Sequence, residues 1–261
     1  MNYKIIISKK DLASLNIYES LKKLGFTENV HVVQEGSIYA DDINKRFPAD
    51  FIIFPTKHQS DSMKKTLTVH NPGNWEKAEL GGKDFTLPPS NAVVLKNALL
   101  QLKKINNLDY EVSGEATHHG PSLEIPSLFI EIGSNKLQWR DKEAADIIAK
   151  TIISIVKNTH PANYKTAIAI GGGHYMPSFN KIIEKTNIAL AYVCPKHNLE
   201  NLNELTLQQA IERSSTLIDF ILVDWKGLGQ HKDKVIKLLE EFNLPIKRID
   251  KVLKDKEFLV S

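Results

Sequence analysis

The sequence is poor in cysteine, in arginine and in long apolar stretches, and each shortage excludes a class of protein. Its single cysteine, Cys194, rules out an internal disulfide bond and a zinc site built from several thiolates. Any metal ion would therefore be held by histidine or carboxylate side chains. No apolar run is long enough to span a membrane, and the first residues lack the apolar core of a signal peptide. We therefore expect a folded, cytoplasmic protein.

The net charge is also small, at +3 from 34 Lys+Arg and 31 Asp+Glu residues. A charge of this size neither requires nor excludes a nucleic-acid partner, because the arrangement of the lysines on the surface decides that question. Arginine occurs only at positions 46, 140, 213 and 248. Contacts to phosphate would therefore come mainly from lysine acting as a point charge.

Short apolar runs alternate with amphipathic segments along the whole chain. The runs predict strands at Tyr3–Ser8, Phe51–Phe54, Leu67–Val69, Tyr110–His119, Ser127–Ile132, Thr166–Ile170, Ile188–Val193 and Phe220–Val223. Helical spacing predicts helices at Ala13–Leu24, Ser90–Ile105, Asp141–Val156, Pro177–Lys185, Thr206–Ser214 and Lys232–Phe242. Such alternation is typical of a three-layer α/β/α fold with a mixed, largely parallel central sheet. No linker divides the chain, so we expect a single α/β domain over residues 1–261.

Six of the nine histidines follow, or end, a predicted strand: His58, His70, His118, His119, His174 and His197. Ligands of open α/β sheets bind beyond the carboxyl ends of the strands, so parallel strands would bring these side chains to one rim. A lone loop histidine such as His58 or His197 is more often structural. His31, His160 and His231 have still less to suggest a role.

The stretch from Ser113 to Ser134 carries the strongest chemical signal, the adjacent pair His118 and His119. Successive side chains of a strand point to opposite faces, so the two imidazoles share one centre only if the strand breaks near Gly120. Otherwise one of them is catalytic and the other structural. Glu115 precedes the pair by three residues.

Glu131 lies inside the apolar run LFIEIGS, where burial of a carboxylate is costly unless it is paired or bound to a metal. It could also be a charge on an exposed strand face. The nearby histidine pair favours a functional role.

Gly171, Gly172 and Gly173 follow an apolar strand and lead into His174 and a helix. They form neither a Walker loop nor a dinucleotide fingerprint. Their N–H groups could bind a phosphate or a developing oxyanion, or they could only form a tight turn.

Histidines, carboxylates and a glycine-rich loop together suit hydrolysis of a polar carbonyl compound or a phosphate ester. Water could be activated by zinc held by His and Glu, or by a histidine acting as general base. The sequence contains neither HExxH nor GxSxG, which removes support from two common hydrolase types. A zinc-dependent amidohydrolase or peptidase acting on a small molecule, and a non-catalytic RNA-binding module, are the competing interpretations.

Four motifs resemble those of one known family, the D-aminoacyl-tRNA deacylases of the archaeal and plant type. They are HNPGNW at 70–75, GEATHHGP at 114–121, FIEIGS at 129–134 and GGGHYMP at 171–177, in the family's order. The resemblance implies a fold similar to peptidyl-tRNA hydrolase and phosphorylase-like proteins. It also implies zinc-dependent hydrolysis of the ester between a D-amino acid and the terminal ribose of tRNA, which removes D-amino acids from translation.

Carried over to matching positions, the resemblance implies site residues in three groups. The catalytic candidates are His118, His119, Glu115 and His174, and the metal candidates are His118, His119, His174 and Glu131. Substrate-binding candidates within the matched motifs are His70, Asn71, Gly171, Gly172 and Gly173. Lys57 and Lys196, which lie outside the motifs but near strand ends, could also help to hold the acceptor stem. One of the two glutamates would orient a histidine or recognise the α-ammonium group. The expected partner is the acceptor end of D-aminoacyl-tRNA, with neither DNA nor membrane, and the protein is expected to be a monomer.

Overall fold

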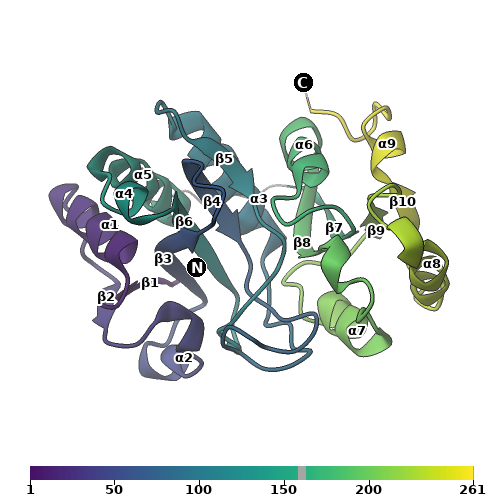
Figure 1. Cartoon of the computed structure of the whole chain (residues 1–261), viewed down its shortest axis with the longest axis horizontal. Coiled ribbons are helices and arrows are strands. Elements are labelled where there is room, and N and C mark those ends of the chain that lie inside the picture. The colour runs from purple at the N-terminus through teal and green to yellow at the C-terminus, as the bar shows by residue number, and fades with distance from the viewer. Residues whose placement is uncertain (158–162, 261) are drawn as a thin grey trace.

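The computed structural model describes residues 1–157 and 163–260, and within them the strands form two sheets (Figure 1). The larger sheet has six strands in the order β2-β1-β3-β6-β4-β5. Its strands are β1 (Tyr3–Ser8), β2 (Val30–Val33), β3 (Phe51–Gln59), β4 (Thr66–His70), β5 (Glu111–Gly114) and β6 (Ser127–Ser134). Only the β4–β6 pairing is antiparallel, so β4 and β5 run against the other four strands. The predicted α/β fold with a mixed, largely parallel sheet is confirmed.

The remaining strands form a second sheet, so the chain has two sheets where the sequence suggested one. Its order is β10-β9-β7-β8, and all of its pairings are parallel. These strands are β7 (Lys165–Ile170), β8 (Ile188–Cys194), β9 (Phe220–Val223) and β10 (Ile246–Arg248). One apolar cluster draws side chains from both sheets, among them Val69 and Leu128 of the first and Leu190 and Phe220 of the second. This shared core supports the single domain, which stays a prediction.

The three longest helices, α1 (Leu12–Lys23), α3 (Ala92–Ile105) and α5 (Lys142–Lys157), pack on one face of the six-stranded sheet. The others are α2 (Ile43–Arg46), α4 (Lys136–Trp139), α6 (Pro177–Lys185), α7 (Glu204–Glu212), α8 (Lys232–Glu240) and α9 (Ile249–Val252). Short 3₁₀ turns lie at Ser37–Tyr39, Lys196–Asn198 and Gly229–His231. Side chains cap the starts of two helices: Asn91 Oδ1 accepts from the Val94 amide before α3, and Asp141 Oδ1 accepts from the Glu143 and Ala144 amides before α5. None of the described helices is long and apolar enough to cross a membrane.

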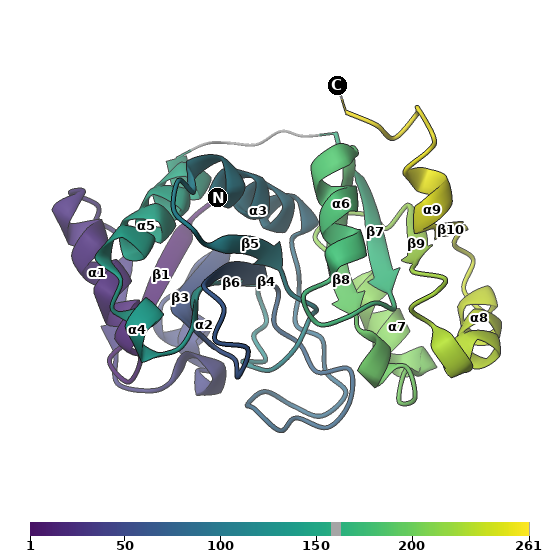
Figure 2. The same ribbon diagram turned by 45° about the horizontal axis from the view of Figure 1, so that its top comes forward.

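Helix α3 joins the two sheets, as the view in Figure 2 shows. Its Lys96 is buried and donates hydrogen bonds to the carbonyl oxygens of Ile183, Thr186 and Ile188, at 2.5, 2.6 and 2.9 Å. Burial lowers the pKa of Lys96 to about 8, so the ammonium group is still charged at neutral pH. Lys96 therefore ties the first sheet's helix layer to the end of α6 and the start of β8.

The opposite face of the six-stranded sheet is covered only in part. Ile52, Phe54 and Phe129 pack there against Ile43 of α2 and Leu123. Because strand side chains alternate between faces, every second residue after Phe54 and Phe129 also points to this side. These residues of β3 and β6 lie beyond the apolar cover. The candidate functional residues lie on this uncovered part of the sheet.

Candidate active site

Strand register gathers the first group of polar side chains on the open face. Glu131 of β6 lies directly opposite Thr56 of β3 and Thr68 of β4. His58 is two residues beyond Thr56, and His70 is two residues beyond Thr68 in the antiparallel neighbour. The two histidines therefore flank Glu131 diagonally, one toward each end of β6, at a spacing that long side chains can bridge. The antiparallel run of β4 thus gathers the site on a face of the sheet instead of on one rim.

Glu131 is buried but well supported. Its Oε1 accepts a 2.7 Å hydrogen bond from Thr56 Oγ1, its Oε2 lies 3.5 Å from His58 Nδ1, and its Oε1 lies 3.8 Å from His70 Nε2. Burial alone would raise the pKa of Glu131, but His58 and His70 hold it well below its usual range. The carboxylate is thus ionised, and the exposed-face alternative does not apply, since only 3% of the residue is exposed.

A second buried carboxylate, Glu115, follows directly after β5. Its Oε2 is 2.8 Å from His174 Nε2, and its Oε1 is 3.1 Å from His58 Nδ1. Burial would raise the pKa of Glu115, but the hydrogen bond from His174 and the charge of His58 lower it to about 2. For His58, burial lowers the pKa, but the glutamates on either side raise it to about 10. His58 therefore carries the positive charge that keeps both carboxylates ionised.

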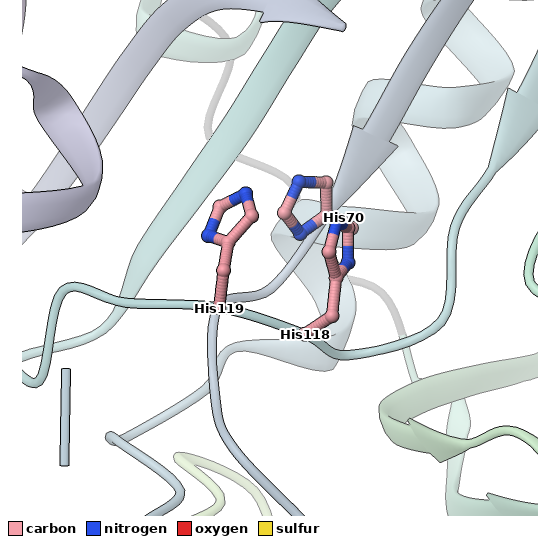
Figure 3. A group of neighbouring side chains, drawn as sticks. All are labelled: His70, His118 and His119. Carbon is pink, nitrogen blue, oxygen red and sulfur yellow. The ribbon is translucent and has the colours of Figure 1, made fainter. Parts of the chain in front are cut away.

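His118 and His119 face the same centre, because the strand ends before them. The predicted strand Tyr110–His119 is regular only over Glu111–Gly114, and His119 adopts a left-handed φ of 47°. The Gly73 amide donates to the carbonyl oxygens of both histidines, at 3.3 and 2.8 Å, and so holds this turn. Figure 3 shows the result: the rings of His118 and His119 gather beside that of His70, with centroids 4.2 and 4.8 Å from it.

The hydrogen bonds of these three imidazoles define which nitrogen carries the proton. Each ring has its Nδ1 within reach of a backbone carbonyl oxygen: Asn71 for His70 (3.3 Å), Ala116 for His118 (2.8 Å) and Gly120 for His119 (2.6 Å). An Nδ1–H that donates to a carbonyl oxygen leaves Nε2 with a free lone pair, as in histidines that bind metals. Burial and neighbouring histidines lower the pKa of His118 well below its usual value and that of His119 to about 4. Both are therefore neutral at physiological pH.

Within the described residues, three groups of side chains bring possible ligand atoms within 4.8 Å of one another. They are His70 with His118 and His119, Glu115 with His118 and His174, and Glu131 with His58 and Glu115. The four predicted metal ligands all occur in these groups, though not in the same one. His70 Nε2 is buried and finds no hydrogen-bond partner among the described residues. An orphaned imidazole nitrogen beside neutral histidines is the donor set that a metal ion prefers.

Two cavities meet at this cluster. The larger, of about 630 Å³, extends over the open face from Glu131 and His58 toward the end of β1. The smaller, of about 220 Å³, lies over the Gly73–Leu80 segment and Thr117. Both cavities are lined by His118, His119 and His174. The histidines therefore form a wall that a substrate can reach from two sides.

The other predicted substrate residues have different surroundings. Lys57 is exposed and lines the larger cavity, with its Nζ 4.8 Å from the centre of the Trp139 ring. The side-chain Nδ2 of Asn71 donates to the Ala191 carbonyl oxygen at 2.8 Å and so connects the cluster to β8. His197 is exposed and lines the smaller cavity. His160 lies outside the described residues.

The glycine loop turns the chain so that His174 reaches Glu115. Gly171 and Gly172 have positive φ of 101° and 79°, which suits glycine. The Gly171 amide donates to the Cys194 carbonyl oxygen, and a Cβ on Gly227 would lie 2.4 Å from the Gly172 nitrogen. The contacts match the tight-turn alternative, and the anion-binding role of Gly171, Gly172 and Gly173 stays a prediction.

His58 is the main residue that the sequence prediction omitted from the site. It is buried between the two glutamates, and its Nε2 is 2.7 Å from the Tyr175 hydroxyl. The available signal was the alternation along FIIFPTKH, which places His58 on the same face as Thr56. That signal became useful only once the pairing of β3 with β6 was known.

Comparison with known proteins supports the reading of this site. The sequence profile of the family described as D-aminoacyl-tRNA deacylase matches residues 45–247. A D-aminoacyl-tRNA deacylase from Thermococcus onnurineus is 37% identical over 265 residues, covering 92% of this chain and 97% of its own length. One from Methanococcus vannielii is 38% identical over 266 residues, covering 95% of this chain and 100% of its own.

A solved structure is also similar over the whole chain. It is the crystal structure of a conserved protein of unknown function, with a TM-score of 0.90 and 28% identity, and it covers 100% of this chain and 99% of its own. The two-sheet arrangement is therefore shared with an experimental structure. The expected likeness to peptidyl-tRNA hydrolase and phosphorylase-like proteins stays a prediction.

Proposed function

Because the chain belongs to the D-aminoacyl-tRNA deacylase family, we propose that it hydrolyses the ester bond of D-aminoacyl-tRNA and releases the free D-amino acid. One observation carries the proposal: neutral histidines and ionised, buried carboxylates meet at the junction of two cavities. Such a cluster is costly to fold, and clusters of this kind mark functional sites. The cytoplasmic location and the monomeric state remain expectations.

We assign the metal-binding role to the group around His118. His118 and His119 offer two neutral nitrogens, His70 offers a third nitrogen beside them, and Glu115 or Glu131 completes the set of possible ligands. His174, also predicted as a ligand, is assigned the proton transfers instead. The buried, unpartnered Nε2 of His70 is the observation that best fits a metal ion. Zinc is the metal that the family resemblance implies. When bound, it would lower the pKa of a coordinated water and polarise the ester carbonyl.

The chain's own residues supply the proton transfers. His174 Nε2–H donates to Glu115, which leaves Nδ1 as the basic nitrogen of a ring that lines both cavities. His174 takes the proton of the attacking water, and the Glu115 carboxylate stabilises the imidazolium that forms. His174 then returns the proton to the ribose oxygen as the ester breaks. Glu131, fixed by Thr56, keeps His58 and His70 in place beside the reacting groups.

The test is the release of amino acid from D- and L-tyrosyl-tRNA, each with and without a zinc chelator. We expect release from the D-substrate, loss of that activity with the chelator, and recovery when zinc is added back. Measuring the salt dependence of substrate binding separates this function from that of a small-molecule amidohydrolase, because phosphate contacts weaken steeply with salt. A folded protein that binds tRNA without releasing amino acid would refute the proposal.

A further inference from the structure

The larger cavity has an aromatic side chain fixed at its mouth. Tyr39 ends the 3₁₀ turn Ser37–Tyr39 and is 60% exposed, although it lines a cavity that leads to Glu131. A Cβ on Gly36 would lie 3.5 Å from Tyr39 Cδ2, and one on Gly81 would lie 3.2 Å from Tyr39 Cδ1. Gly81 therefore leaves room for one edge of the ring, and Gly36 lies at ordinary contact distance from the other edge.

The loops under Tyr39 are locked together. A Cβ on Gly81 would lie 1.9 Å from the Ile38 carbonyl oxygen, and one on Gly120 would lie 2.3 Å from the Gly82 nitrogen. The Gly120 amide donates to the Leu80 carbonyl oxygen. Tyr39 is thus an exposed ring on a rigid support, the arrangement that stacks a nucleic-acid base at low entropic cost.

The two cavities also differ in charge. Lys10 and Lys57 line the larger cavity, where Asp11 accepts from the backbone amides of Ser14 and Lys57, and the charge of Glu131 is offset by the neighbouring His58. Glu76 and Glu79 line the smaller cavity, with Lys77 as its one lysine. Positive charge suits the phosphates of a polynucleotide, and negative charge suits the α-ammonium group of an amino acid.

We propose that the larger cavity binds the terminal nucleotides of the tRNA, with Tyr39 stacked on a base, and that the smaller cavity receives the aminoacyl group, with Glu76 facing its ammonium. The scissile ester then lies at the histidine wall that both cavities share. This inference rests on the proposed deacylase function and adds which side of the site holds which half of the substrate.

The test uses two probes that cannot be hydrolysed, each matching one half of the substrate. The trinucleotide CCA represents the tRNA end, and D-tyrosinol represents the aminoacyl group with its ammonium. Their dissociation constants are measured directly for the wild type and for the variants Tyr39→Ala, Tyr39→Phe and Glu76→Gln. Thermal unfolding of each variant confirms that it is folded, as the exposure of Tyr39 and the matched shape of glutamine lead us to expect.

We expect Tyr39→Ala to weaken CCA binding by roughly 5- to 150-fold, the value of one base stacked on an aromatic ring, and to leave D-tyrosinol binding unchanged. Tyr39→Phe keeps the ring and keeps CCA binding. Glu76→Gln weakens D-tyrosinol binding about fivefold, as for a partly exposed ion pair, and leaves CCA binding unchanged.

The assignment is overturned if Tyr39→Ala weakens D-tyrosinol binding and Glu76→Gln weakens CCA binding, or if each variant affects both probes equally or neither. It is also overturned if the wild type binds neither probe at millimolar concentration. Deacylation of D-tyrosyl-tRNA by the wild type is measured in parallel. If it proceeds while the probe pattern fails, only the cavity assignment is wrong. If it does not proceed, the proposed function itself fails, whichever probes bind.

Discussion

The two sheets of this protein are built from similar strands but do different work. In the four-stranded sheet, β7, β8 and β9 bury the runs AIAI, IALAYV and FILV, and successive side chains enter two apolar clusters, one on each face. In the six-stranded sheet, one face packs apolar side chains against the helices, and the other carries Thr56, His58, Glu131 and His70 beside an apolar cluster. The six-stranded sheet therefore carries buried ionisable side chains on one face, and the four-stranded sheet is apolar on both faces.

This difference shows how a buried ionisable cluster is tolerated. Each carboxylate has a histidine within 3.5 Å, and Glu131 also has the Thr56 hydroxyl. A buried charge is costly only when it is left without partners. The second sheet contributes to this network through the loop after β7, which delivers His174.

The largest effect should be on catalysis and should come from the ionisable cluster beside the six-stranded sheet. Glu115→Gln removes the charge that orients His174 and stabilises its protonated form, so we expect kcat for D-tyrosyl-tRNA to fall by roughly 10²- to 10⁴-fold. The matched control is Glu111→Gln, at the exposed start of β5, the strand that ends just before Glu115, and it should keep wild-type kcat. Single-turnover deacylation measures both. A Glu115→Gln enzyme within tenfold of wild type would remove the distinction between the sheets.

The next largest effect should be on stability and should come from the four-stranded sheet. Leu222 of β9 is fully buried in the cluster shared by the two sheets. Leu222→Ala should lower the free energy of unfolding by about 2–5 kcal/mol, because a cavity replaces packed methyl groups. Leu217→Ala, at a leucine that is 94% exposed, is the control. Urea unfolding measures both, and deacylation at low temperature should stay near wild type.

The junction between the sheets can be tested at Lys96. Lys96→Met keeps the side-chain length but leaves three buried carbonyl oxygens without their donor, so we expect a loss of about 1–3 kcal/mol. Lys104→Met, on the exposed side of the same helix, should change stability by less than about 0.5 kcal/mol. Denaturant midpoints of the two variants give the comparison. Equal midpoints would mean that Lys96 does not tie the sheets together.

The smallest effects should come from removing two tyrosine hydroxyls, that of Tyr110 next to β5 of the six-stranded sheet and that of Tyr164 next to β7 of the four-stranded sheet. Tyr110 donates a 2.9 Å hydrogen bond to Asp141, and Tyr164 donates a 3.2 Å bond to Asn97. Tyr110→Phe should cost about 1 kcal/mol, and Tyr164→Phe, with the longer bond to a neutral acceptor, should cost less. Differential scanning calorimetry of the two variants shows which substitution lowers the melting temperature more. The reverse order would show that local packing outweighs these bonds.

Local sequence patterns predicted much of the fold. The helix predicted at Ser90–Ile105 is observed at Ala92–Ile105, and every predicted strand overlaps an observed one, although β2 and β10 were not predicted. The division into two sheets was not predicted, because an apolar run does not reveal which neighbour it pairs with. The antiparallel direction of β4 was not predicted for the same reason, because strand direction depends on contacts between residues far apart in the chain.

In the candidate site too, residues in local motifs could be predicted, and residues brought in by strand pairing could not. His118, His119 and Glu115 lie within the single motif GEATHHGP, which was enough to propose them as site residues. His58 reaches Glu131 only through strand pairing across more than seventy residues, so its isolated sequence context gave no reason to include it. The turn at His119 was predicted only as a condition for a shared centre, and that condition is met.

The placement of His58, Glu131 and His70 in neighbouring strands has a consequence for engineering. Their relative positions depend on strand register, so the exposed connection at residues 61–63 can change length without moving them. A slip of one residue in β3 would instead present Lys57 in place of His58 and abolish the cluster at once. The protein is thus a scaffold in which insertions into the β3–β4 connection can introduce new recognition while β6, which lies between the two strands, keeps the reacting groups in register.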